Sequence, residues 1–232
     1  MKFPAALPRA CTPVKSAAMD VRSISRDEYL ADLAVHAAGL AFGIIGAAVL
    51  IVLASLQGRA TPIVTVSIYS AGLVAMLTCS AIYNIFQPAQ RTSWLRRMDH
   101  AAIFVMIAGS CTPFALQGPE GWRIVELVVL WVVALAAAGI KLFRPGRYER
   151  AMIWLYLALG WGGAAILAQQ IAELPMGAAV MLALGGVLYS IGVIFHQWDS
   201  LKFSNAVWHV FVLAAAICHY GAIMGGVVYA QP

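Results

Sequence analysis

Polar residues spaced four positions apart interrupt the long apolar stretches of this sequence. The pairs are Asp32 with His36, Ser80 with Asn84, and Asn205 with His209. Residues four apart share one face of an α-helix, so each pair would present two polar side chains together. Carboxylates, hydroxyls and imidazoles held together in this way move protons or ligate metals. Asp99 and His219 are the other candidates, and these residues can act together only if neighbouring elements bring them to one place.

The elements that must position them are membrane-spanning helices. Hydrophobic residues make up 62% of the chain, only 11% of residues are charged, and the mean hydropathy is +0.83. This excess of apolar residues indicates that lipid is the solvent. A helix needs roughly 20 apolar residues to cross the hydrocarbon core. We therefore predict an all-α, seven-transmembrane helix bundle, with spans at about 29–55, 61–86, 98–117, 122–143, 151–171, 175–195 and 203–229.

The basic residues predict the orientation of this bundle. Residues 1–24 form a basic tail that we expect to be disordered, and residues 25–230 form one domain. Thirteen of the fifteen Lys and Arg residues fall on the N-terminal side of the membrane, and only Arg59 and Arg123 fall on the other. The positive-inside rule therefore predicts a cytoplasmic N-terminus and an external C-terminus. The net charge of +5 follows this loop pattern, so we expect membrane lipids, and no nucleic acid, as partners. The sequence leaves the oligomeric state open.

This orientation places the polar pairs in one layer. The first, third and seventh spans begin at the cytoplasmic side and the second ends there, so the three pairs and Asp99 should lie at similar depth. At about 1.5 Å per residue, His219 should lie roughly 15 Å beyond His209, near the middle of the membrane.

A purely structural role is also consistent with the sequence for several of these residues. We expect Asp32 to be a helix N-terminal acid, stabilised by the helix dipole and still in contact with water. His36 is equally consistent with a hydrogen-bonded interior histidine and with a site residue. We expect His219 to be a histidine satisfied within the core. Asp99 is the better candidate for function, because polar residues of neighbouring spans converge on its level.

The sequence resembles the bacterial hemolysin III proteins and the wider progestin and adipoQ receptor family over about residues 25–225. The motifs that carry this resemblance are Asp32-x-x-x-His36-x-x-Gly39, Ser80-Ala81-Ile82-Tyr83-Asn84, Met98-Asp99-His100-Ala101-Ala102-Ile103, Leu188-Tyr189-Ser190-Ile191-Gly192 and Asn205-x-x-x-His209-Val210-Phe211. The resemblance implies a zinc site, built from a histidine four residues after a serine on the second span and a pair of histidines four apart on the seventh. It also implies an aspartate on the third span that holds the metal-bound water. Ser80 matches the serine, Asp99 the aspartate and His209 the second histidine of the pair.

Two of the three zinc-ligand histidines that the resemblance implies are replaced here by Asn84 and Asn205. Zinc prefers imidazole or thiolate to an amide oxygen. We therefore predict a degenerate metal site without a tightly bound cofactor, in which Asn84, Asp99, Asn205 and His209 form a metal-free cluster satisfied by hydrogen bonds. Two alternatives stay open, namely a weak or relocated metal site that uses His36 or His219, and zinc retained at His209.

The resemblance implies an integral, multi-pass protein of the cell membrane that acts in lipid sensing, membrane homeostasis or membrane perturbation. The alternative is a metal-dependent, ceramidase-like lipid amidase with a cytoplasmic-side active site, in which Asp99 and Ser80 are catalytic and zinc supplies a hydroxide. A retinal protein is excluded because the seventh span offers no lysine beyond Lys202 for a Schiff base. A pore is not indicated, since no span carries a regular polar stripe.

Overall fold

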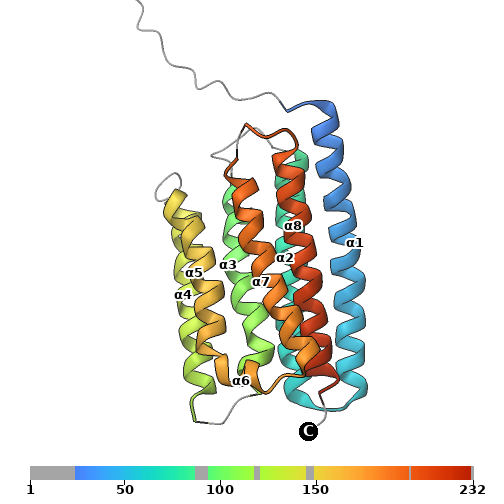
Figure 1. Cartoon of the computed structure of the whole chain (residues 1–232), viewed down its shortest axis with the longest axis vertical. Coiled ribbons are helices and arrows are strands. Elements are labelled where there is room, and N and C mark those ends of the chain that lie inside the picture. The colour runs from blue at the N-terminus through green and yellow to red at the C-terminus, as the bar shows by residue number, and fades with distance from the viewer. Residues whose placement is uncertain (1–23, 87–93, 118–120, 145–148, 199, 231–232) are drawn as a thin grey trace, which may run out of the picture.

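The computed structural model describes residues 24–86, 94–117, 121–144, 149–198 and 200–230. Within these ranges the chain forms a bundle of helices that lie side by side along one direction (Figure 1). The helices are α1 (Arg26–Leu56), α2 (Ala60–Phe86), α3 (Trp94–Ala115), α4 (Arg123–Phe143), α5 (Glu149–Ile166), α6 (Ala168–Ala172), α7 (Met176–His196), α8 (Ser204–Ile223) and the π-helix η1 (Met224–Val228).

The predicted all-α membrane bundle is confirmed. Six helical stretches in the described ranges are long and apolar enough to cross a membrane, and residues Ala151–Ile166 of α5 form a seventh, shorter apolar helix. The span expected at 151–171 is interrupted, because α5 ends before Leu167 and α6 begins after it. The predicted tail at 1–24 lies outside the described residues except for Ile24. Which end of the bundle faces the cytoplasm stays a prediction.

The first helix begins at a complete capping box. Ser25 Oγ accepts a hydrogen bond from the Glu28 amide at 3.3 Å, and the Glu28 carboxylate accepts one from the Ser25 amide at 3.0 Å. Such a box satisfies two amide groups that a helix start would otherwise leave unpaired. Farther along α1, a Cβ atom at Gly43 would lie 2.7 Å from the Leu77 side chain of α2. Glycine therefore allows α1 and α2 to approach closely in this part of the bundle.

The pairing of α7 with α8 depends on glycine in the same way. A Cβ atom at Gly185 would lie 2.2 Å from Cδ2 of His219, and one at Gly192 would lie 2.9 Å from Cβ of Phe211. Both glycines are buried. Because a β-carbon has no room at either position, α7 and α8 lie against each other along much of their length.

The helices α4 and α5 stand at one side of the bundle, opposite α1 (Figure 1). Gln170 on α6 donates to Glu126 on α4 at 2.9 Å, and Tyr156 on α5 donates to the carbonyl of His100 on α3 at 3.1 Å. Toward α7, the indole of Trp161 donates to Ser190 Oγ at 3.1 Å. These contacts hold α5 at the bundle while leaving an interior space between it and α3, α7 and α8, and that space contains the candidate site.

Candidate functional site

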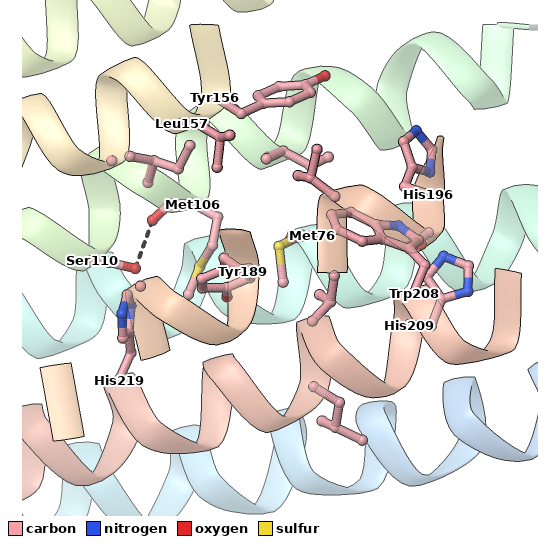
Figure 2. A pocket seen from close by; sticks show the side chains of 18 of the residues that line it. Met76, Met106, Ser110, Tyr156, Leu157, Tyr189, His196, Trp208, His209 and His219 are labelled. Carbon is pink, nitrogen blue, oxygen red and sulfur yellow. Dashed lines mark hydrogen bonds between the residues drawn. The ribbon is translucent and has the colours of Figure 1, made fainter. Parts of the chain in front are cut away.

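A cavity of about 1460 Å³ occupies the interior of the bundle. Residues of α1, α2, α3, α5, α6, α7 and α8 line it. Along α3 it extends from Arg96 to Phe114, which at 1.5 Å per residue is a length of about 27 Å. Figure 2 shows the middle of this cavity, with Met76, Met106 and Tyr189 between His209 toward one end and His219 toward the other.

A carboxylate and two imidazoles meet at the end of the cavity where α1 begins. His209 Nδ1 lies 2.5 Å from Asp32 Oδ1, and His36 Nε2 lies 3.5 Å from Asp32 Oδ2. The centroids of the two imidazole rings are 4.4 Å apart. Each of the three side chains is at most 11% exposed. Asp32 thus lies between a histidine of its own helix and a histidine of α8.

Two local features place these side chains together. The spacing of Asp32 and His36 puts both on one face of α1. At the other side, Glu28 Oε1 accepts a hydrogen bond of 2.9 Å from the amide of Phe203, the residue just before α8, whose φ of 63° is left-handed. Glu28 therefore both caps α1 and ties down the start of α8, and His209 follows a turn and a half later on the helix that begins there.

Asp99 and its neighbours form a second polar group at the same end. The Ser80 hydroxyl hydrogen-bonds to the Asp99 carboxylate. The Asn84 amide nitrogen donates to the Ser80 carbonyl at 3.0 Å and to Ser80 Oγ at 3.4 Å. Asp99 is 8% exposed and also interacts electrostatically with His209 and His36. Both polar groups contribute side chains to the lining of the cavity.

The structure brings the predicted residues other than His219 to one end of the cavity but pairs them differently. We expected His209 to join Asn84, Asp99 and Asn205 in one cluster, whereas its hydrogen bond is to Asp32. The reason is that α1 and α8 are adjacent here and joined by Glu28. Asn205 lines the cavity, but it is an exposed residue in the first turn of α8.

Asp32 was expected to be a water-facing acid at a helix start, and this expectation was wrong. The residue is only 8% exposed. Because α1 begins at Arg26, Asp32 lies in the second turn, beyond the region where the helix dipole stabilises an acid. Its carboxylate is stabilised by imidazoles instead. Sequence reasoning missed this partnership, although the shared spacing of the two polar pairs on α1 and α8 is the signal that could have indicated it.

His219 lines the deep part of the cavity, where Figure 2 shows it beside Ser110. We expected a histidine satisfied in the core; the ring is buried, and its polar neighbour is the backbone of Leu182 on α7. Its ring packs edge-on against Tyr189, with the centroids 5.5 Å apart. The close packing at Gly185 fixes the ring between α7 and α8.

The zinc site that the family resemblance implies does not fit this donor set. Its ligand positions hold Asn84, Asn205 and His209, so two amides replace imidazoles. The amide nitrogen of Asn84 is already bonded to Ser80, and Asn205 is exposed. Zinc sites of proteins are built from Cys, His and carboxylate ligands.

A helical bundle that spans the membrane several times and encloses a long cavity with one polar end defines the class: a multi-pass membrane protein with an interior cavity. The chain belongs to the haemolysin-III related family, whose profile matches residues 29–220. This finding confirms the resemblance in the sequence.

Individual relatives cover most of the chain. It is 29% identical over 200 residues to "Hemolysin-3" of Bacillus cereus, and the aligned region covers 85% of this chain and 90% of that protein. It is 30% identical over 200 residues to the "Hemolysin-3 homolog" of Bacillus subtilis (strain 168), with 85% and 93% covered. It is also 28% identical over 207 residues to the "Monocyte to macrophage differentiation factor" of Homo sapiens, with 84% and 83% covered.

Proposed function

We propose that this protein is a lipid sensor that binds an acyl-chain membrane lipid in its interior cavity. The observation that carries this proposal is the cavity volume of about 1460 Å³, which exceeds the roughly 300–1,000 Å³ of pockets for drug-sized ligands. Its length along α3, about 27 Å, is most of the roughly 30 Å hydrocarbon thickness. An acyl chain has the shape and polarity that such a space accepts.

The lining supports an amphipathic ligand with a defined orientation. Carboxylates and imidazoles lie at one end, whereas the walls beyond them are apolar and include Met76, Met106 and Ile107. Methionine side chains adapt to ligands of different shape. The polar group of the lipid would therefore lie near Asp32 and Asp99, with its chain extended toward His219. A water-filled channel is lined by polar residues, so the apolar wall favours lipid binding over pore formation.

The test introduces a bulky side chain into the cavity from α5. Ala164 on α5 lines the cavity, whereas Ala158 on the same helix is exposed and lies outside the lining. We expect Ala164→Phe to weaken binding of a fluorescent acyl lipid to the protein in nanodiscs by about tenfold or more, which is a loss of about 1.4 kcal/mol. Ala158→Phe is the matched control and should bind like the wild type. Equal binding by both variants would refute the cavity as the lipid site.

A second candidate function is hydrolysis of a lipid amide bond. It is favoured by the two buried carboxylates and two imidazoles at the polar end, where the head of a bound lipid would lie. Asp99, hydrogen-bonded to Ser80, would act as the general base toward an attacking water. General acid–base groups contribute about 10²–10⁴-fold to a rate, so Asp99→Asn should slow release of fatty acid from an N-acyl lipid by that factor. Asp27→Asn, at an exposed site on α1, is the control. Wild-type protein that releases no fatty acid would eliminate this candidate.

A further inference from the structure

We infer that Asp32, His36 and His209 form a site for a divalent transition metal ion of the zinc class, displaced toward α1 from the position that the family resemblance implies. The site shares His209 with that position and takes its other two donors from the first helix. It requires no bound lipid, so it stands or falls independently of the proposed lipid binding.

The geometry of the donor atoms carries this inference. One ligand atom from each of the three residues lies within 4.8 Å of the others. The Asp32 carboxylate is 2.5 Å from His209 Nδ1 and 3.5 Å from His36 Nε2. Tetrahedral zinc, with bonds of about 2.0–2.2 Å, separates its ligand atoms by about 3.3–3.6 Å. Small side-chain rotations therefore suffice to bring all three donors to a common ion.

The surroundings of His36 support a ligand site at the same place. The residue His36 is 6% exposed, and the polar neighbour of its buried Nε2 atom is the Asp32 carboxylate, at 3.5 Å. That separation is longer than the roughly 2.7–3.2 Å of a usual N–H···O hydrogen bond, so the carboxylate satisfies this nitrogen only weakly. A buried polar atom that is only weakly satisfied is a position where an ion or a water can bind. An ion shared by His36, Asp32 and His209 would satisfy this nitrogen and take the place of the proton between the other two residues.

The surrounding charges fit a dication inside a membrane. Asp32 is a ligand, and Asp99 interacts electrostatically with both histidines of the site. The two carboxylates can balance a charge of +2, whereas an unbalanced ion in the bundle interior would be costly. Two imidazoles and one carboxylate are the donors of open zinc and non-haem iron sites, which leave further coordination positions free. All three residues line the cavity, so a free position would face it.

The test measures metal binding alone. The purified full-length protein in detergent is stripped with a chelator and titrated with Co²⁺, a spectroscopic substitute for zinc, and then with Zn²⁺ in competition. We expect one ion per chain. His36→Gln, Asp32→Asn and His209→Gln should each weaken binding at least about 100-fold, the upper end of what loss of an outer-sphere partner costs.

Matched controls distinguish the new position from the one that the resemblance implies. Asn84→Ala and Asn205→Ala should leave the affinity unchanged, as should His219→Gln, which removes a cavity histidine remote from the site. X-ray absorption of the wild-type zinc complex should show two imidazole ligands, a result that does not depend on how the variants fold. Absence of stoichiometric metal, a single imidazole in the absorption spectrum, or binding unaffected by His36→Gln in a folded variant would each overturn the inference.

Discussion

At the scale of single residues, Asp32 is the most consequential side chain of the polar end. It is nearly buried, it hydrogen-bonds to His209 of the last spanning helix, and it lies 3.5 Å from His36 of its own helix. A carboxylate buried in a membrane protein is stable only when it is paired. The imidazoles supply this pairing, and the carboxylate in turn orients both rings.

Removal of this charge should destabilise the fold. Hydrogen bonds to charged groups contribute about 1.5–3 kcal/mol, so we expect Asp32→Asn to lower the free energy of unfolding by about 2 kcal/mol. Thermal unfolding of the metal-free protein in detergent measures the effect. Asp27→Asn on the exposed side of the first turn of α1 is the control. An Asp32→Asn variant as stable as this control would show that the pair with His209 adds nothing to stability.

The sequence predicted part of this site and not the rest. The four-residue spacing placed Asp32 beside His36, and helix direction placed His209 at the same level, because both follow from local geometry. The pairing of His209 with Asp32 depends on which two helices lie in contact. That choice is made by packing between helices distant in sequence, which the spacing within one helix does not report.

At the scale of elements, glycine positions decide how α7 and α8 meet. The substitution Gly185→Ala would place a methyl group 2.2 Å from the His219 ring. The ring is confined between the two helices, so α7 and α8 must separate. Overpacking of this kind costs about 1–3 kcal/mol. We expect this loss in the unfolding free energy, measured by chemical unfolding monitored by circular dichroism.

A matched substitution on the same helix separates packing from helix propensity. Gly177→Ala meets no atom within 4 Å, so it should be neutral or stabilising, because alanine is favoured over glycine by about 1 kcal/mol in a helix. The double variant Gly185→Ala/His219→Ala should recover much of the lost stability. If Gly185→Ala alone is no less stable than Gly177→Ala, the close contact with His219 is not a constraint on the fold.

The break between α5 and α6 could not be predicted from the apolar pattern of the sequence. The apolar run at 151–171 predicted one helix, but the backbone leaves the helical conformation at Leu167, with φ of −92° and ψ of 20°. The short helix α6 that follows buries Gln170, whose side chain bonds to Glu126 of α4. This interruption is stabilised by a contact between two helices. An apolar pattern within one segment therefore could not reveal it.

At the scale of the whole molecule, the apolar content and span lengths predicted the all-helical membrane bundle, because lipid imposes both. The cavity was not predictable in this way. Apolar patterns show that a helix face avoids water, but they do not distinguish a face packed against protein from one that lines a cavity. The space between α3, α5, α7 and α8 depends on the relative placement of complete helices.

The orientation of the molecule in the membrane is a prediction at this scale. With the N-terminus in the cytoplasm, the turn between α1 and α2 lies outside and the loop between α7 and α8 lies inside. In a cysteine-free background, Gln57→Cys should therefore react with a membrane-impermeant thiol reagent on intact cells. Lys202→Cys should react only after the cells are permeabilised. Both residues are exposed in the structure, and the reverse labelling pattern would invert the topology.

The contact between Asp32 and His209 joins positions 177 residues apart, and this separation has a consequence for biogenesis. During synthesis, Asp32 and His36 enter the bilayer with the first helix, long before their partner on the last spanning helix exists. Until then the carboxylate has only His36 of its own helix as a partner and lacks its hydrogen bond to His209. The polar end of the cavity is therefore among the last parts of the molecule to be assembled, and a chain truncated before α8 would lack the hydrogen bond between this acid and His209.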